Sequence, residues 1–298
     1  MRLVPVGAVV VNWNGRGDTL ACLESLLTAD PRPARVVVVD NGSTDDSVPA
    51  ISAWIARRAD SGFEMLRSNE NRGFAGASNL ALRRLASDAN LAHFFLLNND
   101  AAVDAGCFGE IEHALAEAPA TAILGPTIFE TGSARVWYAG GVVSRWRAFG
   151  RSYHEIPRGG ARVVPTEFVS GCAMVISRRA WDLLGPLPES YFMYFEDAEY
   201  CMRARAAGLE IGYAPRGVVH HRVAGTVDRG AVAAGLASTV LPGRGPCSRG
   251  ATCAARSGGV RSPTSSWSAS PRPRSGRSAA APPAPGRHIA VPGPGYWR

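Results

Sequence analysis

The first 125 residues alternate between short apolar runs and segments with apolar side chains on one helical face. Strands buried on both faces carry near-continuous apolar runs, whereas amphipathic helices repeat their apolar residues every three or four positions. On this basis we predict strands over 6–11, 35–39, 63–67, 93–97 and 121–125, and helices over 18–29, 47–58, 76–87 and about 104–117. Repeated strand–helix units favour an α/β fold with a mostly parallel sheet and flanking helices.

The pattern becomes less regular after residue 125. An aromatic and glycine-rich piece, Trp137-Tyr138-Ala139-Gly140-Gly141, has no clear period. Further on we predict a strand over 168–176, a helix over 196–207, and strands over 210–213 and 217–220.

Polar side chains follow three of the predicted strands at the points where those strands end. The clusters are Asn12-Trp13-Asn14-Gly15, Asp40-Asn41-Gly42-Ser43 and Asn98-Asn99-Asp100. Open α/β sheets bind ligands at the carboxyl ends of their strands. We therefore expect a ligand site where these clusters meet.

Each cluster has both a functional and a structural interpretation. A carboxylate such as Asp100 can hold Mg²⁺ or Mn²⁺ with few protein ligands, or it can belong to a turn that caps the next helix. Asp40 can accept hydrogen bonds from a base or ribose, or segment 40–47 can be a turn in which Asp45 or Asp46 caps a helix. The residues alone leave both interpretations open.

Three further segments carry chemistry of their own. The small-residue loop 69–79, with Arg72, can face phosphate or can simply pack a helix start. The pair 196–197 follows an aromatic run that would raise a carboxyl pKa and suit it to general-base work, although acids at a helix N-terminus are also ordinary dipole partners. The pair 220–221 consists of histidines, which are either metal ligands or ordinary buried or solvated side chains.

Charge is unevenly distributed over the 298 residues. All 32 basic residues are arginine, and nine of them follow residue 230, where aspartate and glutamate are absent. Without these nine the formal charge of +7 becomes −2, so the first 230 residues do not support nucleic-acid binding. Residues 231–298 are rich in Arg, Pro, Ser, Gly and Ala, and we predict a disordered tail there, which a frameshift in a GC-rich gene would also produce.

The cellular location follows from cysteine spacing and from hydropathy. The six cysteines include no CxxC pair and indicate free thiols. The N-terminal apolar run is too short for a signal peptide, and no stretch has the length of a membrane span. We therefore expect a cytoplasmic protein.

Seven segments occur in an order that is typical of one family. They are VVVNWNG, VVVVDNGSTDDS, NENRGFAGASN, FFLLNND, FVSGCAMVISR, YFMYFEDAEYCMRARAAG and YAPRGVVHH. Together they resemble the family-2 glycosyltransferases, and in particular the rhamnosyltransferase-like branch from bacterial polysaccharide synthesis. The resemblance covers roughly residues 5–228. It implies a glycosyltransferase A-type fold in one domain over 1–230, with a nucleotide-sugar-binding half over 1–125 and an acceptor-binding half over 126–230.

The resemblance also implies roles for individual residues. Asp197 matches the catalytic base, and Glu196 is its alternative. Asp100 matches the metal-binding acid of the family's Asp-x-Asp motif, and His221, or else His220, matches a metal-binding histidine. The donor-binding residues that it implies are Asn12, Asp40, Asn41, Arg72, Gly73, Asn79 and Asn99.

The implied reaction moves a sugar, with rhamnose as one candidate, from a nucleoside-diphosphate sugar to a hydroxyl group of a glycan or lipid-linked glycan. The resemblance implies inversion at the anomeric carbon, Mn²⁺ or Mg²⁺ as cofactor, and a role in cell-envelope polysaccharide synthesis. An acceptor of this kind would also bring the protein into peripheral contact with the inner face of the cell membrane.

Two departures from the family pattern leave a second hypothesis open. Residues 185–189 read GPLPE where the family has GGFDE, and the family pattern stops near Thr226. A truncated relative that binds nucleotide without turnover is therefore the alternative. A nucleotidyltransferase is disfavoured because the first strand is not followed by the long glycine-rich loop with a basic signature that such enzymes use.

Overall fold

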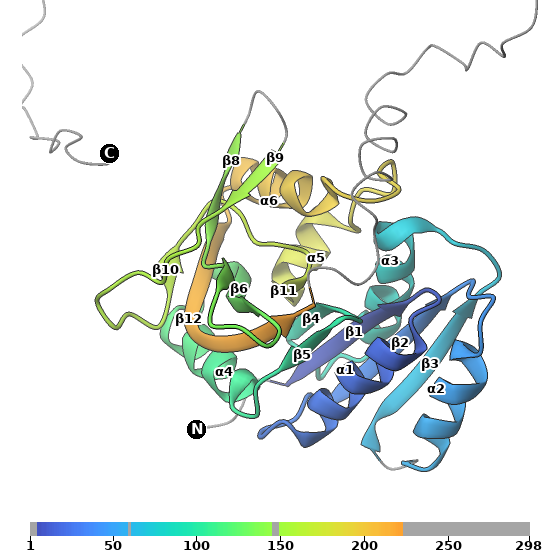
Figure 1. Ribbon diagram of the computed structural model, residues 1–298. Coiled ribbons are helices and arrows are strands. Elements are labelled where there is room, and N and C mark those ends of the chain that lie inside the picture. The colour runs from blue at the N-terminus through green and yellow to red at the C-terminus, as the bar shows by residue number, and fades with distance from the viewer. Residues whose placement is uncertain (1–4, 59–60, 145–148, 223–298) are drawn as a thin grey trace, which may run out of the picture. The chain divides into compact units, whose positions relative to one another are not determined.

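The apolar runs of the first hundred residues form the central strands of a sheet. The computed structural model describes residues 5–58, 61–144 and 149–222, all within one compact unit of the chain. Each of the first elements lies within a few residues of its predicted range, so the α/β prediction is confirmed (Figure 1). These elements are β1 (Val6–Asn12), α1 (Arg16–Thr28), β2 (Arg35–Asn41), α2 (Ser47–Ala56), β3 (Phe63–Ser68), α3 (Gly73–Ala86) and β4 (His93–Asn98).

The second part of the described chain contains more strands than its pattern predicts. Its elements are β5 (Ala101–Val103), α4 (Cys107–Glu117), β6 (Thr121–Glu130), β7 (Val136–Tyr138), β8 (Gly141–Ser144), β9 (Phe149–Ser152), β10 (Val164–Pro165), β11 (Ala173–Ser177), α5 (Arg178–Leu184), α6 (Glu196–Ala206) and β12 (Glu210–His221). The irregular segment after residue 130 thus contains the short strands β7 to β10, which are too short to show a period in the sequence.

The main sheet has the order β10-β12-β6-β11-β4-β1-β2-β3. Its long strands run in one direction, with β1 parallel to β2 and β4, β2 parallel to β3, and β12 parallel to β6. β11 is inserted antiparallel between β4 and β6. Five consecutive buried residues form this strand, as its position inside the sheet requires.

The helices cover both faces of the sheet. α1 and α2 contact each other and lie on one face, whereas α3 packs against β1 and β2 from the other (Figure 1). The chain leaves β1 towards β2 on one side, and β4 later returns to the other side of β1. The carboxyl ends of these strands therefore flank a topological switch point, where open α/β sheets bind ligands.

The second part of the chain differs from the sequence predictions at three places. The strand predicted over 168–176 begins only at Ala173, because the preceding residues form a loop. Helix α5 was not predicted from its seven-residue sequence. The strands predicted over 210–213 and 217–220 are one strand, β12, with an irregularity in its pairing between Ala214 and Val218.

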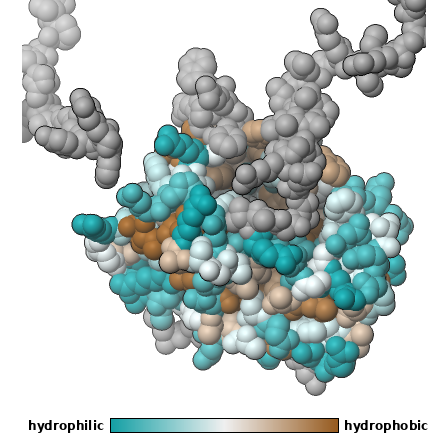
Figure 2. Space-filling view, in the orientation of Figure 1, coloured by the Kyte–Doolittle hydropathy of each residue, from teal (hydrophilic) through white to brown (hydrophobic). Residues whose placement is uncertain are grey.

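The surface and the chain end add two observations. None of the helices within the described ranges is long and apolar enough to cross a membrane. On the face shown in Figure 2, hydrophobic residues form small patches among hydrophilic ones. The tail predicted over 231–298, with its frameshift hypothesis, and the last residues of the predicted domain lie outside the described residues.

Candidate active site at the carboxyl ends of the central strands

The ends of β1 and β2 are joined by a buried hydrogen-bond network. Asn12 and Asp40 are register partners, and Asn12 Nδ2 donates to Asp40 Oδ1 at 2.8 Å and to Ser43 Oγ at 3.0 Å. Thr19 Oγ1 donates to Asn12 Oδ1 at 2.7 Å, and the Ser43 amide donates to Asp40 Oδ2 at 3.1 Å. Asn12 and Asp40 are buried, whereas Ser43 is partly exposed. The polar clusters at two strand ends thus form one rigid wall.

The loop after β1 extends this wall towards solvent. Asn14 adopts a left-handed conformation with φ 51°, and its side-chain oxygen accepts hydrogen bonds from the amides of Thr44 at 2.8 Å and Asp45 at 3.3 Å. Asn tolerates this backbone conformation better than most residues. Asp45 Oδ1 also accepts from the Ser47 amide at 3.0 Å, so the turn that the sequence allowed is present beside the functional candidates. The neighbouring Trp13 is exposed.

Asn41 positions the turn that carries Arg72 and Gly73. Its Oδ1 accepts from the Arg72 amide at 2.9 Å, and its Nδ2 donates to Asn71 Oδ1 at 2.8 Å. Gly73 begins α3 with φ 69°, a conformation that favours glycine. The side chain of Arg72 is exposed. Asn41 therefore orders the backbone of this turn and leaves the guanidinium to solvent.

Asn79 and Asn99 are used differently from the other donor-site candidates. Both amide hydrogens of Asn79 are engaged, by Leu187 O at 2.9 Å and Glu189 Oε1 at 2.9 Å, and its oxygen accepts from the Leu187 amide at 3.0 Å. Asn79 thus attaches the segment 187–189 to α3. Asn99 Nδ2 donates to Thr19 Oγ1 at 3.0 Å, which joins Asn99 to the network around Asn12.

Asp100 and His221 meet although they belong to distant parts of the chain. His221 Nε2 lies 3.1 Å from Asp100 Oδ1, and each side chain is 10% exposed. β12 pairs with β5 directly after Asp100, with His221 opposite Ala101. His220 points to the other face, because neighbouring residues of a strand alternate, and its Nε2 lies 2.9 Å from Asp104 Oδ1. Of the two histidine candidates, the structure therefore brings His221 to Asp100 and directs His220 away from it.

The Asp100–His221 pair fits a divalent cation as a two-ligand site. No group of three or more His, Cys, Asp or Glu side chains suited to a metal ion occurs within residues 5–222 apart from the gaps noted above. Two neighbouring ligands about 2.1 Å from an octahedral ion lie about 3.0 Å apart, which agrees with the separation of this pair. His221 Nδ1 is buried without a hydrogen-bond partner among these residues. A donor's phosphate oxygens and water would have to supply the remaining ligands, as is usual for Mg²⁺.

Glu196 and Asp197 begin α6 beside a fixed backbone amide. Asp197 Oδ2 accepts from the Gly171 amide at 2.9 Å, and its Oδ1 accepts from the Ala198 amide at 2.7 Å. Glu196 is buried, and its Oε2 has no hydrogen-bond partner within the described part of the chain. Burial and the neighbouring Asp197 carboxylate raise the pKa of Glu196 to about 8. Burial also raises the pKa of Asp197, although the Gly171 and Ala198 amides partly oppose this shift.

The carboxylate pair lies at the same edge of the sheet as Asp100. We call this edge, formed by the carboxyl ends of β1, β2 and β4, the rim. The Asn98 amide donates to Cys172 O at 2.9 Å, next to Gly171, whose amide bonds Asp197. This chain of two hydrogen bonds connects the end of β4 to the start of α6. Gly171 and Thr19 were missed by sequence reasoning, because a backbone amide and a common hydroxyl residue give no distinctive signal.

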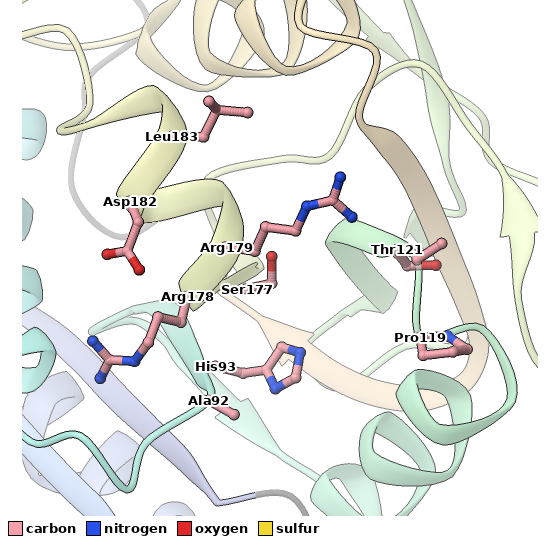
Figure 3. A pocket seen from close by; sticks show the side chains of 10 residues that line it. Ala92, His93, Pro119, Thr121, Ser177, Arg178, Arg179, Asp182 and Leu183 are labelled. Atoms are coloured by element: carbon pink, nitrogen blue, oxygen red, sulfur yellow. The ribbon is translucent and has the colours of Figure 1, made fainter.

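One surface depression lies at the end of the strands opposite to the rim. It has a volume of about 740 Å³ and is lined by His93 at the start of β4, Thr121 at the start of β6, and Arg179 and Asp182 of α5 (Figure 3). Since parallel sheets bind ligands at their carboxyl ends, the rim is the candidate active site and this depression is not. A polar depression of about 800 Å³, lined by Asn14, Asp18 and Arg222 among others, lies at the rim itself.

Comparisons with known proteins show which proteins this chain is similar to. The family model described as glycosyl transferase family 2 matches residues 8–183. The low-salt glycan biosynthesis hexosyltransferase of Haloferax volcanii is 24% identical over 205 residues, 68% of this chain and 62% of that protein. The N-acetylglucosaminyl-diphospho-decaprenol L-rhamnosyltransferase of Mycobacterium tuberculosis is 28% identical over 225 residues, 68% of this chain and 72% of that protein.

The fold also matches a solved structure. The crystal structure of GalNAc-T7 with UDP, GalNAc and Mn²⁺ has a TM-score of 0.62 and 15% identity, covering 74% of this chain and 43% of that chain. At this identity the likeness shows the fold alone. The chain spans less than two thirds of the length of both the Haloferax protein and GalNAc-T7. Because the family model matches more than half of its residues, the chain belongs to glycosyl transferase family 2.

Proposed function

We propose that this chain transfers a sugar from a nucleoside-diphosphate sugar to a hydroxyl group of a glycan or lipid-linked glycan. The observation that carries the proposal is the arrangement of three groups on one rim. The wall at Asn12 and Asp40, the Asp100–His221 pair, and the Glu196–Asp197 pair are linked through hydrogen bonds at the ends of β1, β2 and β4. The transfer reaction requires three neighbouring sites, one for the nucleoside of the donor, one for its diphosphate and one for the acceptor hydroxyl.

The donor would lie against the wall formed by β1 and β2. Asp40 accepts hydrogen bonds from Asn12 and from the Ser43 amide, so its carboxylate is held in place before any ligand binds. The exposed guanidinium of Arg72 is the cation that the Asn41-ordered turn presents near this wall. A cation at this position would stabilise the negative charge of a phosphate. A divalent cation held by Asp100 and His221 would offset charge on the leaving diphosphate.

Asp197 is the proposed general base. It would accept the proton of the acceptor hydroxyl while that oxygen attacks the anomeric carbon and the bond to the diphosphate oxygen breaks. The nucleoside diphosphate then leaves with the electron pair of that bond. One displacement of this kind inverts the anomeric configuration, and no second carboxylate is needed as a nucleophile. The Gly171 amide fixes Oδ2 of Asp197 and so orients the carboxylate for this transfer.

The relatives support a finer proposal about substrates. The Mycobacterium protein is named as an L-rhamnosyltransferase acting on a diphospho-decaprenol acceptor, which makes rhamnose and a lipid-linked glycan the first candidates for this chain. Such a substrate would place the reaction in cell-envelope polysaccharide synthesis, at the inner face of the cell membrane.

A panel of nucleotide-sugars, incubated with the protein and Mn²⁺, tests this function through slow donor hydrolysis. We expect metal-dependent turnover of one donor, which Asp100→Ala abolishes and Asp197→Asn strongly reduces. The control variant is Asp182→Asn, since Asp182 is an exposed carboxylate at the opposite end of the sheet. Nucleotide binding without turnover in the unmodified protein would instead favour a truncated relative with a donor site alone. Absence of both would refute the proposal.

A further inference from the structure

The surface depression opposite to the rim brings together polar side chains that the proposed function does not use. His93 begins β4 and Ser177 ends β11, and the two are register partners, so their side chains stand side by side on one face of the sheet. Thr121 begins β6, the strand on the other side of β11. Figure 3 shows these three side chains around the same space as the guanidinium group of Arg179. Three neighbouring strands and α5 thus contribute polar groups to one place.

Most of these polar groups have no partner among the described residues. Neither ring nitrogen of His93 forms a hydrogen bond with another described residue, and its Nδ1 is buried. The guanidinium group of Arg179 and the hydroxyl group of Thr121 likewise have no hydrogen-bond or ion-pair partner in the described part of the chain. Ser177 Oγ accepts from the Ala180 amide at 3.1 Å, which leaves its own hydrogen to donate. A ligand that enters this space would therefore meet several unused polar groups at once.

The charge around the depression is positive. Arg178 and Arg179 both line it and form no ion pair among the described residues, whereas Asp182 is the acidic side chain of the lining. Arg178 is fixed by hydrogen bonds to three main-chain oxygens of the segment 86–91, at 2.6–3.0 Å, so no carboxylate neutralises it. Burial lowers the pKa of His93 to about 4, which leaves its imidazole uncharged at neutral pH. Two cations and one anion give the lining a net positive charge.

These groups are complementary to one class of ligand. A guanidinium group carries five N–H donors and each hydroxyl group adds one, so the matching ligand is negatively charged and rich in acceptor oxygens. A phosphate group meets both requirements, whereas a carboxylate presents only two oxygens. The volume of about 740 Å³ leaves room for more than a phosphate group, and the exposed Leu183 adds an apolar edge. A small organic phosphate ester combines these properties.

We propose that this depression is a second ligand site, separate from the rim, in which Arg179 and the hydroxyl groups of Ser177 and Thr121 bind the phosphate group of a small soluble phosphate ester beside His93. The site is built at the ends of β4, β6 and β11 that lie away from the rim. It therefore requires neither the metal nor the nucleotide-sugar of the proposed function, and it can be tested in their absence.

The first test observes the imidazole of His93 directly. Ring ¹H–¹³C correlation spectra at pH 7.5 resolve the 6 histidines of the chain, and His93→Gln identifies one signal by its loss. The probes are inorganic phosphate and glycerol 3-phosphate, with sodium chloride and sodium acetate at equal ionic strength as controls. We expect a saturable shift of the His93 signal with the two phosphates alone. Absence of a saturable shift would overturn the proposal, and an equal response to acetate would overturn the assignment to phosphate.

The second test removes the unpaired cation. Arg179→Ala should weaken the binding of glycerol 3-phosphate by about 10-fold or more, because it deletes the charged donor of the site. Arg179 is exposed, so urea unfolding of this variant should match that of the unmodified protein. The matched control is Arg57→Ala, which removes an exposed arginine at the end of α2 that lines neither depression. Equal affinities of the Arg179 and Arg57 variants would contradict the role of Arg179.

Two further outcomes would reassign the phosphate response. A His93 shift that disappears in Arg72→Ala and survives in Arg179→Ala would mean that phosphate binds at the rim, and it would overturn the second site. Vesicles of phosphatidylglycerol supply the same chemistry in a lipid headgroup. Arg179-dependent sedimentation with these vesicles, without a His93 response to soluble phosphate, would assign the depression to a membrane surface and overturn the proposal. None of these readouts uses donor turnover, so a failure of the proposed function is distinguished from a failure of this site.

Discussion

The carbonyl oxygen of Phe192 lies directly against Gly73, where a Cβ atom would come within 2.2 Å of it. The same oxygen accepts a hydrogen bond from the Phe74 amide at 3.1 Å. Phe192 belongs to the loop that leads to Glu196 and Asp197, and Gly73 belongs to the turn that carries Arg72. The loop before the candidate base and the turn beside the candidate donor site are therefore anchored to each other.

Gly73→Ala should break this anchor. The new Cβ would meet backbone rather than a flexible side chain, and φ at this position is 69°. The left-handed conformation alone costs a non-glycine residue about 1–2 kcal/mol, so we expect a loss of at least that size in urea unfolding. Donor hydrolysis should fall as well. The control is Gly17→Ala in α1, where nothing lies within 4 Å and the change should be neutral or stabilising. Equal effects of the two substitutions would contradict the anchor.

Asn12→Ala should lower stability and nucleotide affinity together. The substitution leaves Asp40 Oδ1 and Thr19 Oγ1 without their buried partner, which costs about 1–3 kcal/mol. Urea unfolding measures the first effect, and titration with donor nucleotide measures the second. Asn90→Ala, which removes an exposed amide bonded to Asp88, should change neither quantity. A normal nucleotide affinity in a folded Asn12→Ala protein would remove this wall from the donor site.

Asn79→Ala is expected to lower the stability of the fold and to leave the affinity for nucleotide nearly unchanged. Its amide is engaged by Leu187 and Glu189, so its loss frees the segment 187–189 from α3. We expect unfolding to become easier by about 1–3 kcal/mol, with nucleotide affinity within about twofold of the unmodified protein. A large loss of nucleotide affinity without a loss of stability would instead support the direct contact between Asn79 and the donor that the family resemblance implies.

Donor turnover should rise with pH, and the rise should occur at a higher pH than the pKa of an ordinary aspartate would give. Asp197 must be ionised to accept a proton, and burial raises its pKa. Glu196, whose pKa is raised to about 8, would remain protonated while Asp197 ionises first. Glu196→Gln should therefore retain most activity and the same ascending limb, whereas Asp197→Asn should lose both. Turnover that is lost in Glu196→Gln but kept in Asp197→Asn would exchange the two roles.

Glu196 should also make stability depend on pH. Its pKa is raised from 4.5 to about 8, so the folded protein binds this proton more tightly than the unfolded chain. The resulting stabilisation is fully present below pH 4.5 and is lost as pH rises through about 8. Relative to the unmodified protein, Glu196→Gln should thus gain stability in urea unfolding as pH rises from 4.5 to about 8. The exposed Glu210→Gln serves as control, and a pH-independent difference for Glu196→Gln would contradict the raised pKa.

The local pattern of apolar and polar residues was sufficient to predict the central strands and the polar residues at their carboxyl ends. The valine-rich runs at 6–11 and 36–39 are typical of strands buried on both faces, and their polar ends at Asn12 and Asp40 are adjacent because β1 and β2 are parallel neighbours. The elements after residue 125 were predicted less well. β11 is placed antiparallel between β4 and β6, and the short strands β7 to β10 form only by pairing with partners distant in sequence.

The sequence by itself determined the α/β class, the family, and which side chains could do chemistry. Tertiary structure decided which of them meet. It brought His221 rather than His220 to Asp100, because strand pairing with β5 fixes which of two adjacent residues faces the rim. It assigned the amide of Asn79 to Leu187 and Glu189, supplied the Gly171 amide to Asp197, and set Trp137 against His221. None of these contacts can be derived from local sequence, because each joins residues whose proximity depends on the order and register of the whole sheet.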